Sequence, residues 1–252
     1  IREIYKLKKQ KVVPVEIQNG KITRLVKSQI FLNNPYISYD AATGGIALPL
    51  NIQETNYCIQ DMPIRAIHRQ DKHIIEQICE FYGILNPVLK CDLFFTEEEN
   101  EKINFLSQKL SKDFVVIEPY SKTNYTPNRT YPLKKWQNIV DKLSKDIEVV
   151  QVGVNKDKLL NNVTNFIGET TFREAANLIG KSRLLLSSEG GLTHATTAVN
   201  TKALVIITGY QNKNMVCYPQ NINIDISNHD PCGLKILCEQ CVEEARNHDE
   251  SE

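Results

Sequence analysis

Residues 183–198 read RLLLSSEGGLTHATTA and contain the pattern that decides the fold: a short apolar run, a polar turn with two glycines, and the start of a helix. The apolar run at 183–186 predicts a buried strand, and a helix is expected from about Leu192. Glycines let the backbone approach a ligand closely, while the free amides and dipole of a helix start favour an anion such as a pyrophosphate. The same glycine pair also suits a tight strand-to-helix turn that binds nothing.

The sequence around this stretch repeats the order of a short apolar run followed by an amphipathic segment. Strands are expected at residues 114–117, 147–152, 183–186 and 203–207, and helices at 133–143, 172–179 and from about 192 onward. Strands and helices that alternate at this spacing are typical of right-handed crossovers and a mostly parallel sheet. The sequence therefore predicts an α/β fold in which ligands bind beyond the carboxyl ends of the strands.

The first part of the chain follows a different pattern. Strand signals at 12–17 and 22–26 flank Asn19-Gly20, a dipeptide favoured in tight hairpins. Residues 33–63 show no sustained period and contain several prolines and glycines, so we expect them to be largely loop.

Two helices are expected before the alternating region, one within 69–81 and one ending near Leu110, whose acidic run fits a solvated helix start. The change of pattern predicts three parts. Residues 1–110 form a first domain, 111–231 a second domain with a mostly parallel sheet, and 232–252 a C-terminal helix and tail.

Composition excludes some classes of function. The 30 basic and 30 acidic side chains cancel, so no whole-molecule field draws the chain to nucleic acid or to an anionic membrane. No apolar stretch approaches the roughly 20 residues of a spanning helix, and no signal segment opens the chain. We expect a cytoplasmic protein with reduced thiols. The first residue, Ile1, is consistent with a chain that begins inside a longer gene product.

Three residues in or beside the predicted loops have chemistry suited to a ligand. Arg129 could grip a phosphate bidentately or lie solvated on a long loop. Asp157 could accept hydrogen bonds from ribose hydroxyls or serve as a helix cap. His194, in the first turn of the predicted helix, faces either a ligand or the sheet.

The cysteines near the C-terminus admit two interpretations. Cys217, Cys232, Cys238 and Cys241 could hold zinc or iron tetrahedrally, since a Cys-x-x-Cys pair lies among them. However, Cys238 and Cys241 fall on the apolar face of a predicted helix, where free cysteine packs as a small hydrophobe. We therefore favour no metal site.

An ordered series of motifs resembles the heptosyltransferase-like glycosyltransferases, glycosyltransferase family 9, which have the two-domain GT-B architecture. The series covers about residues 112 to 220. In chain order it consists of Arg129-Thr130-Tyr131-Pro132 with Trp136, Gln151-Val152-Gly153, residues 166–174 (FIGETTFRE) and residues 188–195 (SEGGLTHA). Short pieces upstream, residues 33–37 and 68–71, are similar to parts of the family's first domain.

The resemblance implies a GT-B-like fold. Residues 1–110 would be a partial or divergent N-terminal domain on the acceptor side, and residues 111–231 a complete C-terminal Rossmann-like domain that binds the nucleotide-sugar donor. The resemblance also implies roles for single residues in binding a nucleotide sugar. By resemblance, Arg129 replaces the lysine that contacts the phosphates, Asp157 is the acidic residue near the ribose, and Glu189 replaces an aspartate. The helix start that binds the pyrophosphate and the signature histidine are Gly190, Gly191, Leu192, Thr193 and His194.

The function implied is transfer of a sugar, with heptose expected, from a nucleotide diphosphate sugar to a hydroxyl acceptor in surface glycan or lipopolysaccharide synthesis. Inversion without a metal or cofactor is expected. The acceptor would be a glycan, a lipid-linked molecule or a protein. Such an acceptor is compatible with peripheral contact of the chain with a membrane. In the family, an aspartate in a Gly-Asp turn near the start of the first domain is expected to take the proton of the acceptor hydroxyl. This sequence has no such turn after a strand before residue 100. The catalytic residue therefore stays unassigned, and we expect little sugar transfer from these 252 residues. The alternative is an inactive nucleotide-sugar-binding or assembly subunit.

Overall fold

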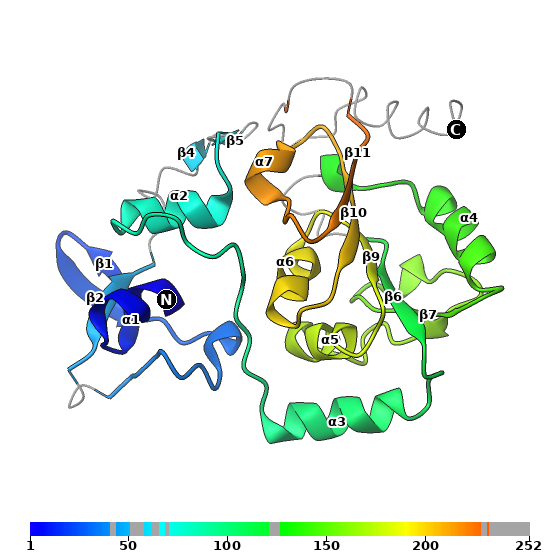
Figure 1. Cartoon of the computed structure of the whole chain (residues 1–252), viewed down its shortest axis with the longest axis horizontal. Coiled ribbons are helices and arrows are strands. Elements are labelled where there is room, and N and C mark those ends of the chain that lie inside the picture. The colour runs from blue at the N-terminus through cyan, green and yellow to red at the C-terminus, as the bar shows by residue number, and fades with distance from the viewer. Residues whose placement is uncertain are drawn as a thin grey trace.

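A six-stranded parallel sheet forms the larger part of the molecule (Figure 1). The computed structural model describes residues 1–40, 44–50, 58–61, 66–68, 71–120, 127–227 and 231. The strands of the large sheet are β6 (Phe114–Glu118), β7 (Glu148–Gln151), β8 (Thr164–Asn165), β9 (Leu185–Ser188), β10 (Ala203–Ile207) and β11 (Ile222–Asp225). Each pairs in parallel with its neighbour, which confirms the predicted α/β fold.

The strand order is β11-β10-β9-β6-β7-β8, which is the order of doubly wound dinucleotide-binding sheets. The chain winds outward from β6 in one direction and from β9 in the other. The loops after these two neighbouring strands therefore diverge and leave a crevice at the carboxyl edge.

Helices cover both faces of this sheet: α3 (Glu97–Ser107), α4 (Leu133–Leu143), α5 (Phe172–Ile179), α6 (Gly191–Ala198) and the short α7 (Lys213–Val216). Since side chains alternate along a strand, Val116 and Leu185 pack with α3, α5 and α6, while Val115 and Val149 pack with α4. Trp136 of α4 is fully buried on the second face. No described helix has the length and apolar content needed to cross a membrane.

A smaller sheet lies beside α1 (Arg2–Lys8) and α2 (Ile74–Phe81). Its strands β1 (Val12–Gln18) and β2 (Lys21–Leu25) form the predicted antiparallel hairpin. Asn19 and Gly20 both have positive φ, 50° and 73°, as a type I′ turn requires. The strand β3 (Ile46–Pro49) is parallel to β1, and Ile4, Val12 and Leu48 form a common core.

The expectation that residues 33–63 are largely loop is wrong at two places. Two strands lie in this region, β3 and β4 (Cys58–Asp61). β4 pairs in antiparallel fashion with β5 (Ala66–His68), which follows the region. β3 and β4 are both four residues long, and β3 follows a glycine pair and ends in a proline, which mask its apolar pattern. The 3-10 turns are η1 (Gln29–Phe31), η4 (Pro127–Arg129) and η5 (Lys156–Lys158).

α3 lies before the predicted domain boundary at 110, yet it packs on the large sheet. Ile103 and Leu106 belong to the same core as α5. Its acidic first turn is also more than a solvated helix start, because both oxygens of Glu99 accept hydrogen bonds from the buried Arg173 of α5 at 2.6 and 2.7 Å. This ion pair joins α3 to α5 and so helps to hold α3 on the large sheet.

Candidate functional site

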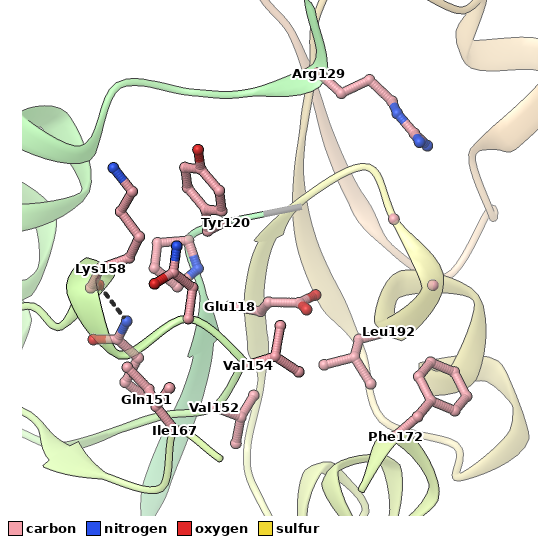
Figure 2. Close-up of a pocket in the computed structure, with 15 residues that line it drawn as sticks. Glu118, Tyr120, Arg129, Gln151, Val152, Val154, Lys158, Ile167, Phe172 and Leu192 are labelled. Carbon is pink, nitrogen blue, oxygen red and sulfur yellow. Dashed lines mark hydrogen bonds between the residues drawn. The ribbon is translucent and has the colours of Figure 1, made fainter. Parts of the chain in front are cut away.

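A cavity of about 590 Å³ lies at the crevice between the ends of β6 and β9. Figure 2 shows its lining side chains, which come from the loops after β6, β7 and β8 and from the starts of α5 and α6. The lining residues include Glu118, Tyr120, Arg129, Gln151, Val152, Val154, Asn155, Lys158, Ile167, Phe172, Gly190, Gly191 and Leu192. The structure thus brings together four of the eight sequence candidates.

The start of α6 presents its backbone to this cavity. Thr193 is buried, and its hydroxyl donates to the Gly190 carbonyl at 2.6 Å and accepts from the Gly190 amide at 3.3 Å. Thr193 therefore fixes the turn from inside, while Gly191 is exposed. A Cβ on Gly191 would lie 3.1 Å from the ring of Phe172, so the absence of a side chain keeps the helix start open to a ligand.

Arg129 and Glu189 form an ion pair at the edge of the cavity, with 2.7 Å between Nη1 and Oε2. The Glu189 side chain is 8% exposed, and its other oxygen lies 3.5 Å from Nε2 of His194. Burial alone would raise the pKa of Glu189, but the hydrogen bond from His194 and the charge of Arg129 hold it below its ordinary value. An ionised Glu189 therefore positions both residues.

The other ring nitrogen of His194 contacts a tyrosine, Tyr218, that sequence reasoning missed. Nδ1 of His194 lies 2.9 Å from the hydroxyl of the buried Tyr218. Because Glu189 is an acceptor beside Nε2, we infer that Nε2 carries the proton and that Nδ1 accepts from Tyr218. Burial is the main cause that raises the pKa of Tyr218, which keeps this hydroxyl a hydrogen-bond donor.

Replacing Tyr218 with phenylalanine is expected to lower the free energy of unfolding by about 1–2 kcal/mol, because Nδ1 of His194 loses its partner. Thermal and urea denaturation measure this loss. Tyr120→Phe, at a half-buried cavity residue, is the matched control and should change stability much less. Equal stability of Tyr218→Phe and wild type would show that the hydrogen bond to His194 contributes nothing.

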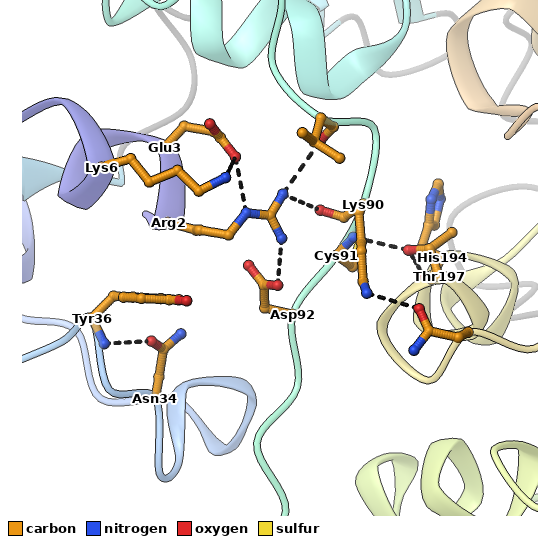
Figure 3. A network of polar contacts seen from close by, with 12 residues as sticks. Arg2, Glu3, Lys6, Asn34, Tyr36, Lys90, Cys91, Asp92, His194 and Thr197 are labelled. Atoms are coloured by element: carbon orange, nitrogen blue, oxygen red, sulfur yellow. Dashed lines mark hydrogen bonds and ion pairs between the residues drawn. The ribbon is translucent and has the colours of Figure 1, made fainter.

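The segment before α3 also holds α6 in place (Figure 3). The amide of Cys91 donates to Oγ1 of Thr197 at 2.8 Å, and Nζ of Lys90 donates to Asn200 at 2.8 Å. On its other side, Arg2 of α1 forms an ion pair with Asp92 and donates to the carbonyl of Lys90 at 3.2 Å. The helix that starts at the cavity is therefore joined to the small sheet's helix through this segment.

Glu118 is a cavity residue that sequence reasoning missed. It is the last residue of β6, pairs in register with Ser187 of β9, and is half-buried at the cavity wall. Burial raises its pKa to about 7, although a hydrogen bond from the Ser187 hydroxyl opposes the shift. The sequence does contain a signal for this residue, because a glutamate at the end of an apolar strand in the middle of a parallel sheet is a candidate for a functional site.

Replacing Glu118 with glutamine is expected to stabilise the protein at about pH 8 by about 1–3 kcal/mol and to have little effect at about pH 5. Between its ordinary pKa and about 7, folded Glu118 binds more protons than unfolded Glu118, so wild-type stability falls as the pH rises through this window. Urea denaturation at the two pH values measures the difference. A variant that is less stable than wild type at about pH 8 would contradict the expectation.

Asp157 does not line the cavity. It is exposed in η5, where its amide donates to Oδ1 of Asn155 at 3.0 Å. Its neighbours Asn155 and Lys158 do line the cavity, and the ammonium of Lys158 lies 5.1 Å from the centre of the Tyr120 ring. The predicted loop is correctly placed, but the side chains it offers to a ligand are the neighbours of Asp157.

The candidate metal ligands are only partly described. Cys217 is a half-buried free thiol, and burial raises its pKa to about 12, which disfavours the thiolate that a metal requires. Cys232, Cys238 and Cys241 lie outside the described residues, as does the predicted C-terminal helix. Within the described ranges, no three potential ligands cluster around a metal-sized space.

Comparison with known proteins gives one family match and several similar structures. The model of glycosyltransferase family 9 (heptosyltransferase) matches residues 64–244. A glycosyltransferase family 9 structure from Veillonella parvula has a TM-score of 0.53 at 14% identity and covers 64% of this chain and 51% of its own. The E. coli ADP-heptose LPS heptosyltransferase II has a TM-score of 0.51 at 17% identity, with 69% and 61% covered.

At these identities the two structures establish the shared fold. The chain spans about half the length of the first and three fifths of the second. A comparison with curated protein sequences gives no match.

Proposed function

The chain belongs to glycosyltransferase family 9, and from this membership we propose that its cavity binds a nucleotide diphosphate sugar whose sugar is transferred to a hydroxyl acceptor. The observation that carries the proposal is the meeting of three features at one crevice. These are the open start of α6 at Gly190 and Gly191, the Arg129–Glu189 ion pair, and the reversal of winding between β6 and β9.

The cavity offers matching chemistry for each part of such a ligand. The backbone amides of a helix start and the guanidinium of an arginine both suit a diphosphate. Val152, Ile167 and Phe172 give an apolar wall on which a nucleoside base can lie. A volume of about 590 Å³ falls within the range of small-molecule sites.

In the transfer, the bond between the anomeric carbon and the diphosphate oxygen breaks as the acceptor oxygen forms a new bond from the opposite face. The acceptor hydroxyl gives its proton to a base, and the diphosphate leaves with the electron pair. The amides of α6 and Arg129 would stabilise the charge that develops on the diphosphate. We extend the proposal to a heptose donor and a surface-glycan acceptor, because the similar E. coli structure is an ADP-heptose LPS heptosyltransferase.

Isothermal titration calorimetry with ADP-, GDP-, UDP- and dTDP-linked sugars tests the donor site. We expect one class to bind with a stoichiometry of one, and its nucleoside monophosphate to bind about tenfold more weakly or worse, because it lacks the second phosphate. Equal affinity for the monophosphate and the nucleotide sugar would contradict a diphosphate site. So would a lack of heat with every nucleotide sugar.

A further inference from the structure

Glu118 places a carboxyl group inside a site proposed for a dianionic ligand. In Figure 2 its side chain points toward the part of the cavity formed by Leu192 and the start of α6. That is where the proposed function puts the diphosphate. An ionised carboxylate there would repel the ligand, whereas a carboxylic acid would donate a hydrogen bond to it.

The neighbourhood of Glu118 favours the acid form. Apolar side chains line the same cavity: Val152 after β7, Ile167 after β8 and Leu192 of α6. Gln151 is committed elsewhere, since its Nε2 donates to the Lys158 carbonyl and its Oε1 accepts from the Leu160 amide, both at 2.8 Å.

The cationic groups that line the same cavity are Arg129, which is ion-paired with Glu189, and Lys158, whose ammonium lies 5.1 Å from the centre of the Tyr120 ring. His194 is not among the lining residues, and its Nε2 lies 3.5 Å from Oε1 of Glu189. Ser187 of β9 is the polar neighbour in register with Glu118.

We propose that Glu118 binds the diphosphate of the nucleotide sugar as a protonated carboxyl, so that binding takes up one proton from solvent. The inference rests on the proposed function. Two negative charges beside the carboxyl raise its proton affinity further, in the direction that burial already imposes on its pKa, which is about 7 in the free protein. Affinity should therefore fall by up to about tenfold for each pH unit above this value.

Calorimetry between about pH 6 and pH 9 with ADP-, GDP-, UDP- and dTDP-glucose tests the coupling, because their diphosphates keep a constant charge over this range. Wild type should lose affinity with rising pH and take up about one proton per site at about pH 8, measured from the difference between phosphate and Tris buffers. Glu118→Gln, a permanently neutral donor of nearly the same shape, should bind with one affinity throughout. Glu101→Gln, on the exposed surface of α3, is the matched control and should keep the wild-type profile.

Ser187→Ala gives a second, independent reading. The Ser187 hydroxyl stabilises ionised Glu118, so its removal should move the loss of affinity to higher pH. Affinity that is constant or rises with pH in wild type, or a wild-type profile in Glu118→Gln, would overturn the inference and leave the donor site standing. Failure of all four nucleotide sugars to bind either protein at about pH 6 would instead overturn the proposed function, and the inference with it.

Discussion

Replacing Gly191 with leucine is expected to weaken nucleotide-sugar binding about a hundredfold or more, which is about 2.7 kcal/mol of binding free energy. Gly191 is the first residue of α6 and lines the cavity. A Cβ at this position already meets Phe172 at 3.1 Å, so the longer side chain must project into the space for the diphosphate. Calorimetry measures the loss of affinity.

The fold should survive this change. Gly191 has no left-handed backbone and is exposed, and leucine is a better helix former than glycine. Gly191→Ala is the matched control, since a single methyl group needs only a small shift of Phe172 and should cost less than about tenfold in affinity. A folded leucine variant with wild-type affinity would exclude the start of α6 as the binding site.

Replacing Arg129 with methionine is expected to lower the free energy of unfolding by about 3–5 kcal/mol, because the Glu189 carboxylate would stay buried without its main cation. The loss should shrink in acid, where Glu189 takes up a proton and the penalty of the unpaired charge disappears. Urea denaturation as a function of pH measures both effects. Equal stability of the variant and wild type at neutral pH would show that the ion pair contributes nothing.

Two companion variants separate the structural role of Arg129 from its binding role. Arg129→Met combined with Glu189→Gln removes both charges and should recover much of the stability while nucleotide-sugar binding stays weak. Arg129→Lys should keep the charge with fewer directed hydrogen bonds. Full affinity in the double variant would show that Arg129 does not contact the ligand.

The sequence predicted the elements whose apolar period is long and regular. The helices α4 and α5 and the strand β10 have the expected bounds, because a buried stripe on a helix or a buried strand leaves a clear pattern. It missed β8, α7 and β11, which are two to four residues long and carry no measurable period. It also missed α1, whose charged residues outnumber its apolar ones.

The site could be predicted only where its parts are local. The glycine turn at 190–191 is a contiguous pattern and lines the cavity as expected. The Arg129–Glu189 contact joins residues 60 positions apart, and the support of His194 by Tyr218 joins residues 24 apart, so neither follows from spacing along the chain. Residue type alone was misleading at Asp157 and Thr193, whose side chains could both contact a ligand. In the structure Asp157 is exposed outside the cavity and Thr193 is buried beneath the glycine turn.

The structure of this chain with a bound nucleotide sugar tests the central claim most directly. We expect the diphosphate to lie about 3 Å from the amides of Gly191 and Leu192 and from the Arg129 guanidinium, within the cavity between β6 and β9. A nucleotide sugar bound elsewhere on the chain, with this cavity empty at saturating ligand, would contradict the account.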